Sequence, residues 1–157
     1  MCGIVSGMDR RWPLTLIIAG VLACGDPSGI GGLTGAFNLA AVDATPPPAL
    51  LGATLNCDEF ADAGLLNLYA NAYDLSLDVI QDCRRSGGDS TVVLLVGSGA
   101  TQVRGDTLVL TDTTGTKPEM SVVRDGKGLA LRFLDSATTF LPLHLYHFTP
   151  QPFINRH

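Results

Sequence analysis

Apolar and polar residues alternate along most of the chain beyond residue 32, which is the repeat of a β-strand with one buried face. The clearest stretch is 73–79 (YDLSLDV), in which every odd position is apolar and every even position is polar. Its polar positions are expected to form a solvent-facing sheet surface. The same alternation, or a run of β-branched residues, predicts further strands at 33–39, 53–58, 66–70, 91–96, 102–104, 107–111, 120–122, 129–133 and 138–148.

Turn signals between these segments indicate the fold class. Glycine, often beside aspartate or threonine, marks turns at 87–89, 105–106, 113–115 and 125–126. Pro142 indicates a bulge or a sheet edge within the last segment. Eight or nine strands joined mostly by short turns predict an all-β, antiparallel up-and-down meander that closes into a barrel, because closure hides the edge strands. Two alternatives stay open: a β-sandwich, and a short helix across 59–72, where Ala and Leu are dense.

The first 24 residues have the pattern of an export signal. Arg10 and Arg11 precede the mostly apolar stretch 12–23 (WPLTLIIAGVLA), which ends in the small residue Ala23. Twelve residues rise only about 18 Å as a helix, whereas the core of a bilayer is about 30 Å thick. A permanent transmembrane helix is therefore the poorer interpretation.

The residues before Cys24 carry a family resemblance. Val21-Leu22-Ala23-Cys24 resembles the lipobox of bacterial lipoproteins, which implies that Cys24 is lipidated and becomes the first residue of the mature chain. Several acyl chains give stable membrane anchoring where one chain does not. The implied location is the bacterial cell envelope, on the periplasmic side or at the outer membrane. The expected organisation is a signal peptide at 1–23, a lipid-anchored tether at 24–32, a β-barrel domain at 33–148 and a tail at 149–157.

A second resemblance covers the domain itself. Residues 33–39 (LTGAFNL), followed by Val42-Asp43 and the prolines at 46–48, look like the opening of lipocalin-like bacterial lipoproteins. The resemblance implies a small barrel with a ligand mouth, and hence a non-enzymatic envelope protein that binds a small apolar ligand. The alternative is an envelope interaction module, such as an inhibitor or assembly factor, acting through its loops at 43–52 and 84–90.

Charge narrows the range of partners. The chain has 10 Lys and Arg residues against 15 Asp and Glu residues, and its formal net charge is −5. Its only basic pairs are Arg10-Arg11 and Arg84-Arg85. Nucleic-acid binding requires a basic footprint on the phosphates, so a nucleic-acid partner is not expected.

Two cysteines remain in the folded part, Cys57 and Cys83. An exported domain with two cysteines is expected to bridge them. Closing a loop of this length stabilises the fold by about 3.5 kcal/mol in the chain-entropy description.

The remaining polar residues do not form a catalytic or metal-binding pattern. His144 and His147 are three apart, so on a strand they point to opposite faces and form no two-ligand clip; the third histidine, His157, is the last residue. Asp58 and Glu59 are expected in a solvated loop. Ser98 lacks the Gly-x-Ser-x-Gly spacing of hydrolases. We therefore expect no catalytic residue, no metal and no cofactor.

Overall fold

The computed structural model describes residues 29–113, 119–134 and 144–152. This part of the chain forms nine strands and one 3-10 turn, and it contains no helix long and apolar enough to cross a membrane. The elements are β1 (Gly35–Val42), β2 (Ala49–Ala53), β3 (Asp58–Leu68), β4 (Ala72–Asp82), η1 (Arg84–Ser86), β5 (Ser90–Arg104), β6 (Thr107–Asp112), β7 (Met120–Asp125), β8 (Gly128–Phe133) and β9 (Leu145–Pro150).

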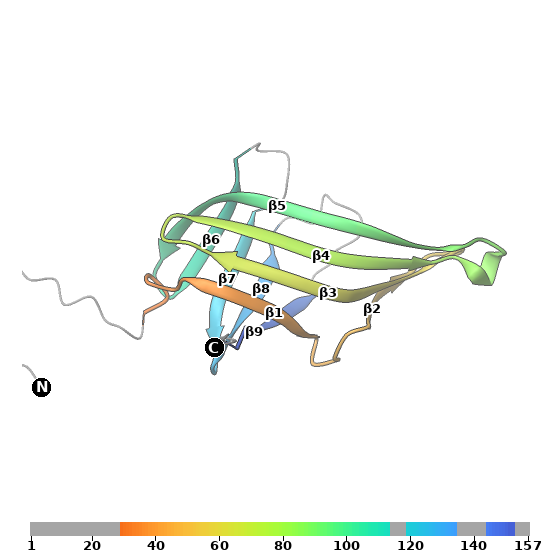
Figure 1. Ribbon diagram of the computed structural model, residues 1–157, viewed down its shortest axis with the longest axis horizontal. Coiled ribbons are helices and arrows are strands. Elements are labelled where there is room, and N and C mark those ends of the chain that lie inside the picture. Colours follow the sequence, from red (N-terminus) through yellow and green to blue (C-terminus); the bar gives the residue numbers. More distant parts are fainter. Residues whose placement is uncertain (1–28, 114–118, 135–143, 153–157) are drawn as a thin grey trace, which may run out of the picture.

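The strands form a closed antiparallel barrel, which confirms the predicted meander (Figure 1). From β3 to β9 each strand pairs with the next, and β1 completes the circle by pairing with β9 on one side and β3 on the other. Phe37 of β1, for example, lies opposite Pro150 of β9 and Leu66 of β3. The β-sandwich alternative is therefore wrong. The alternative helix at 59–72 is also wrong, because most of this stretch belongs to β3.

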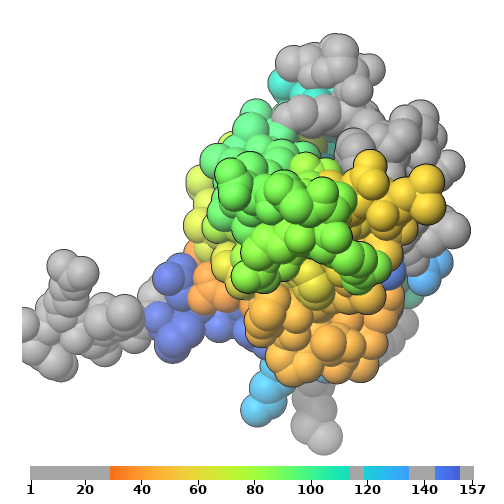
Figure 2. Space-filling view, turned by 90° about the vertical axis from the view of Figure 1, so that its right-hand side faces the viewer, coloured from red at the N-terminus to blue at the C-terminus, as the bar shows by residue number. Residues whose placement is uncertain are grey.

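Three strands run beyond the barrel. β1 pairs with the second half of β3, whereas the extra strand β2 pairs with residues 58–61 in its first half. The strands that run beyond the barrel are β3, β4 and β5. Together with β2, residues 58–61 of β3, 79–82 of β4 and 90–93 of β5 form a four-stranded extension that we call the distal sheet. It projects to the right in Figure 1, and Figure 2 views the molecule from its tip.

The interior of the barrel is filled by apolar side chains. The inward positions of β4 are Tyr73, Leu75, Leu77 and Val79, all buried, while the polar residues between them face outward, as the alternation predicts. The largest fully buried side chains are those of Tyr73, Tyr146, Phe148, Leu66, Leu68, Leu77, Leu110, Leu129, Leu131, Val42 and Val122. Burial of this apolar surface is the main force that stabilises the barrel.

The two ends of the barrel differ, because a meander places its connections alternately at each end. One end has the short turns 69–71, 105–106 and 126–127, and there Ile30 is buried against the core. We call it the closed end. We call the opposite end the open end. It carries longer connections, among them 43–48 and 83–89, and the distal sheet extends from it.

Some predicted strand boundaries were displaced by local turn chemistry. The strand expected at 53–58 is instead the end of β2 followed by a turn, in which the hydroxyl oxygen of Thr54 accepts a hydrogen bond from the amide of Cys57 at 3.0 Å. The segments 91–96 and 102–104 belong to one strand, β5. Of the segment expected at 138–148, residues 138–143, including Pro142, lie outside the described residues, and β9 begins at Leu145.

Gly99 marks the point where β5 gains β6 as a second partner. A Cβ at this position would lie 2.0 Å from the carbonyl oxygen of Thr111 in β6. The backbones of β5 and β6 therefore lie too close together here for any side chain at position 99. At Gly97, two residues earlier, a Cβ would meet only the Tyr73 ring at 3.9 Å, which is ordinary contact.

We therefore expect Gly99→Ala to lower the free energy of unfolding by about 1–3 kcal/mol, because the added methyl group forces β5 and β6 apart. Gly97→Ala is the matched control and should leave stability unchanged or slightly raised, since it only restricts the unfolded chain. Urea unfolding followed by circular dichroism measures both. Equal effects of the two substitutions would contradict this account of the β5–β6 contact.

Candidate functional site

A recess lies on the inner face of the sheet where the distal sheet leaves the open end of the barrel. It has a volume of 220 Å³, and its lining residues come from three adjacent strands: Glu59, Val79, Gln81, Val93 and Leu95. Three of the five side chains are apolar aliphatic groups. The recess is thus an apolar surface with one charged and one amide group at its border.

The strand register brings these side chains together. Glu59 of β3 lies opposite Gln81 of β4, and Val79 of β4 lies opposite Val93 of β5. Paired residues in an antiparallel ladder point to the same face, so all four share the inner face. Leu95 packs against the hydrophobic core, so the recess borders the packed interior of the barrel.

Glu59 is the most distinctive residue of the recess. Its side chain is only 5% exposed, and the side-chain amide of Gln81 donates a hydrogen bond to its Oε1 at 3.2 Å. The sequence-based expectation of a solvated loop is therefore wrong for Glu59, which lies in β3. A carboxylate can accept about four hydrogen bonds, so Glu59 retains capacity for another donor. Burying a carboxylate is costly without such partners.

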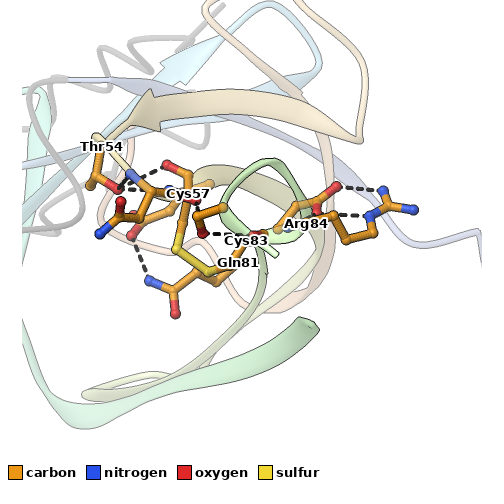
Figure 3. The surroundings of a disulfide bond; sticks show 9 residues. Thr54, Cys57, Gln81, Cys83 and Arg84 are labelled. Atoms are coloured by element: carbon orange, nitrogen blue, oxygen red, sulfur yellow. Dashed lines mark hydrogen bonds and ion pairs between the residues drawn. A yellow bond between two sulfur atoms is a disulfide. The ribbon is translucent and has the colours of Figure 1, made fainter. Parts of the chain in front are cut away.

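The disulfide between Cys57 and Cys83 borders this region, as the sequence predicts (Figure 3). Cys57 immediately precedes β3 and Cys83 immediately follows β4, so the bridge closes the far end of the β3–β4 ladder. Figure 3 shows Gln81 beside the bridge and the Thr54 turn close to it. The bridge thus joins the two strands that carry Glu59 and Gln81.

The tip beyond the disulfide is polar. Arg84 pairs with Asp82, and Arg85 pairs with Asp58. The Arg84 guanidinium beside Asp82 lowers the pKa of that carboxyl to about 2. Both arginine side chains are well exposed, so these pairs add little stability and mainly order the turn η1.

A second polar cluster lies at the open end, around His144. Its Nε2 lies 2.7 Å from the carbonyl oxygen of Leu51 in β2, and its Nδ1 contacts the carboxylate of Asp43. The backbone amide of Leu145 donates to the same carboxylate at 2.9 Å. Both ring nitrogens face acceptor oxygens, an arrangement that suits the protonated ring, which can donate from both. His144 thus links β9 to β2 and to the β1–β2 connection.

The pKa values of this pair shift in opposite directions. Burial opposes the charged ring of His144, but its contacts with Asp43 and the Leu51 carbonyl outweigh burial and raise the pKa of His144 above 6.5. The hydrogen bond from His144 and the amide of Leu145 hold the pKa of Asp43 below 3.8.

The two histidines stay apart, as the sequence predicts. The Nδ1 of His147 lies 2.7 Å from Asp125 Oδ2, away from the His144 cluster. Among the residues that the structure describes, no three His, Cys, Asp or Glu side chains are grouped so as to hold a metal ion. His157 and Cys24, the cysteine of the lipobox-like segment, lie outside the described residues. Lipidation of Cys24 stays a prediction.

The barrel interior also contains tyrosine hydroxyls. Those of Tyr73 and Tyr146 are buried, and the structure gives them no hydrogen-bond partner among the described residues. Burial raises the pKa of Tyr73, and the nearby Asp112 adds to the shift. Tyr146 packs edge-on against Phe133 with ring centroids 5.5 Å apart, so it belongs to the core.

Larger hollows occur at the closed end, with volumes of 620 and 520 Å³. Residues of the entering segment 30–34 line both of them. They are grooves around the point where the chain enters the barrel. The recess beside Glu59 is smaller, but it alone of these three combines inner-face apolar side chains with a buried charged group.

The sequence pattern alone does not identify Gln81 and Asp43 as members of the two polar clusters. A signal for Gln81 was present, because it continues the odd-numbered inward positions of β4 beyond Val79. An amide at an inward position indicates a polar partner. Asp43 carried no local signal of this kind, because its partner His144 is 101 residues away in the chain.

The chain matches no protein-family model, and comparison with curated proteins and with solved structures found no similar protein.

The His144–Asp43 pair predicts a stability that depends on pH. A histidine with a raised pKa in the folded protein stabilises it below about pH 6.5, and this contribution is lost as the pH rises through the folded-state value. Asp43 makes stability depend on pH in the opposite sense at acidic pH, because its stabilising contribution is lost as the pH falls below 3.8. The melting temperature should therefore fall from pH 6 to pH 9. His144→Gln should remove most of this fall.

The control is His147→Gln, which removes a ring that contacts a single carboxylate at the surface. It should retain the dependence of the melting temperature on pH. Identical pH profiles for the wild type and His144→Gln would show that the pair does not couple protonation to folding.

Proposed function

We propose that the protein is a lipid-anchored, non-enzymatic protein of the bacterial cell envelope whose recess beside Glu59 binds a small ligand. The observation that carries the proposal is the apolar recess with a buried carboxylate at its border. Small-ligand sites are mostly apolar and contain a few polar groups that fix orientation, and in β-barrels they lie at the mouth. Here the packed interior leaves the mouth as the place for a ligand.

The lining indicates the chemistry of the ligand. Val79, Val93 and Leu95 suit a hydrocarbon body, and Glu59 suits a hydrogen-bond donor or a cation. The volume of 220 Å³ is below the 300–1,000 Å³ typical of whole drug-sized ligands. The recess therefore accepts a small amphiphile or the end of a longer one, with an amine or similar donor near the carboxylate.

The proposed anchor is supported by the chain before the barrel. The lipobox-like Val21-Leu22-Ala23-Cys24 follows a basic and then an apolar segment. Ile30 is already buried at the closed end. The five residues between Cys24 and Ile30 span at most about 20 Å when extended, so a lipid on Cys24 holds the domain close to a membrane.

The runner-up is an envelope interaction module, such as an inhibitor or assembly factor. The specific observation in its favour is the exposure of the whole tip 84–90, as Figure 2 illustrates from that side. Loops positioned by a rigid scaffold often carry binding function. The ligand-binding proposal has the stronger support, because it also accounts for the buried Glu59.

A pair of probes with matched chains tests the recess. Decylamine should bind at least tenfold more tightly than decanoate, because only the amine offers donors and a positive charge to Glu59. Glu59→Gln should remove this preference, whereas Asp58→Asn, on the adjacent outward carboxylate, should retain it. Isothermal titration calorimetry measures both. Absence of binding by either probe would count against the recess as a ligand site.

The anchor is tested separately by the denatured mass of the protein taken from its own membranes in mild detergent. The expected mass starts at Cys24 and includes the acyl chains, less two hydrogens for the disulfide. Cys24→Ser should abolish acylation and release from the signal segment, because the thiol is the acceptor of the lipid. An unprocessed wild-type chain from Met1 would overturn the anchor proposal without affecting the recess.

A further inference from the structure

The first six residues of β5 have a strand partner on only one side. β5 pairs with β4 from Ser90 to Ala100, but with β6 only from Gly99 to Arg104. Within the described ranges, no strand lies beside residues 90–95 on the side away from β4. Figure 1 shows this stretch as the upper border of the distal sheet. Such an edge presents backbone N–H and C=O groups that can pair with another strand.

This edge lacks the features that usually prevent pairing. Natural proteins protect exposed edges with charges, prolines or bulges. Residues 90–95 (STVVLL) contain neither a charge nor a proline. The β4–β5 ladder also runs without a shift in register, whereas the β1–β9, β2–β3 and β3–β4 ladders each contain one. The edge is therefore straight, uncharged and suited to a further strand.

The side chains of this edge are apolar on both faces. Val92 and Leu94 point to the outer face and are 67% and 57% exposed, and Val93 points to the inner face and is 44% exposed. Three consecutive exposed aliphatic residues on an edge strand are a recognised signature of strand–strand association.

An apolar row on the outer face leads to the same edge. Its members lie opposite one another on successive strands, β2 to β5: Leu50, Phe60, Ile80 and Val92. Phe60 and Ile80, in the middle of the row, are half-buried, while Val92 at its β5 end is exposed. A strand added beside β5 would continue this row and bury Val92.

We infer that β5 pairs with β5 of a second copy of this chain, antiparallel and across a two-fold axis. With Val93 on the axis, Val92 of each copy lies opposite Leu94 of the other, and the two Val93 side chains share the inner face. Such aliphatic cross-strand pairs are favourable. An interface of this kind uses the same patch on both copies, so it must be complementary to itself.

Charge directs a second copy to this edge rather than to another part of the surface. At a net charge of −5, two copies repel each other over most of their surfaces. Residues 90–95 (STVVLL) carry no charge, so two copies can meet there without opposing like charges. The paired distal sheets form one sheet of eight strands. The closed ends lie far from the axis, so this pairing requires neither the proposed anchor nor the proposed ligand.

Native mass spectrometry of the protein purified in mild detergent should give twice the mass of one chain. The double variant Val92→Lys, Leu94→Lys should give the mass of one chain, because it places lysines opposite lysines. The matched control is Val103→Lys, which is also on β5 and 48% exposed but lies where β6 covers the edge. This variant should remain a dimer. Circular dichroism establishes that each variant is folded.

Amide hydrogen exchange of residues 90–95 distinguishes the other occupants. Alternate amides of this stretch already donate to β4. The others, which point away from β4, should be protected in the dimer, and the double lysine variant should lose this protection. A monomeric wild type overturns the inference: unprotected amides would leave the edge to a strand of another protein, and protected amides would assign it to another segment of this chain. A dimer that survives both lysines also overturns it, since its interface would lie elsewhere.

Discussion

The pairing of β1 with both β3 and β9 is the constraint on which the rest of the structure depends. It closes the sheet, so eight strands bury one common face and no edge remains around the barrel itself. β1 has 8 residues, whereas β3 has 11, so closure uses only part of β3. The remainder must project beyond the barrel, together with the strands that pair with it.

The recess and the open edge of β5 both follow from this difference in length. Inside the barrel, an inward side chain meets the opposite wall and is packed, as Leu77 and Leu131 are. On the distal sheet the inward positions continue, but within the described part of the chain no second sheet layer faces β2 to β5. Glu59 and Val93 therefore border a hollow rather than a core. Among the described residues, no strand pairs with residues 90–95 of β5 on the side away from β4.

Much of the fold was predictable because alternation reports which face is buried. Residues 73–79 indicate β4 without ambiguity, and two cysteines in a chain with the pattern of an export signal indicate the bridge. The region 59–72 was ambiguous because Ala and Leu favour helices, and the shift in register between Ala61 and Ala63 interrupts the alternation. The His144–Asp43 contact was beyond sequence reasoning, since only barrel closure brings residues so distant in the chain together.

The position of the disulfide has a consequence for when the protein becomes fully stable. The bridge joins β3 and β4 at the end where the barrel does not hold them. Under the proposed export, the bridge does not form while the chain is in a reducing cytoplasm, so the precursor lacks about 3.5 kcal/mol of stabilisation and is easier to unfold for passage through a membrane. Oxidation after the proposed export then stabilises the distal sheet. The strands that line the recess would thus gain the stabilisation of the bridge only in the oxidising compartment where the protein is proposed to act.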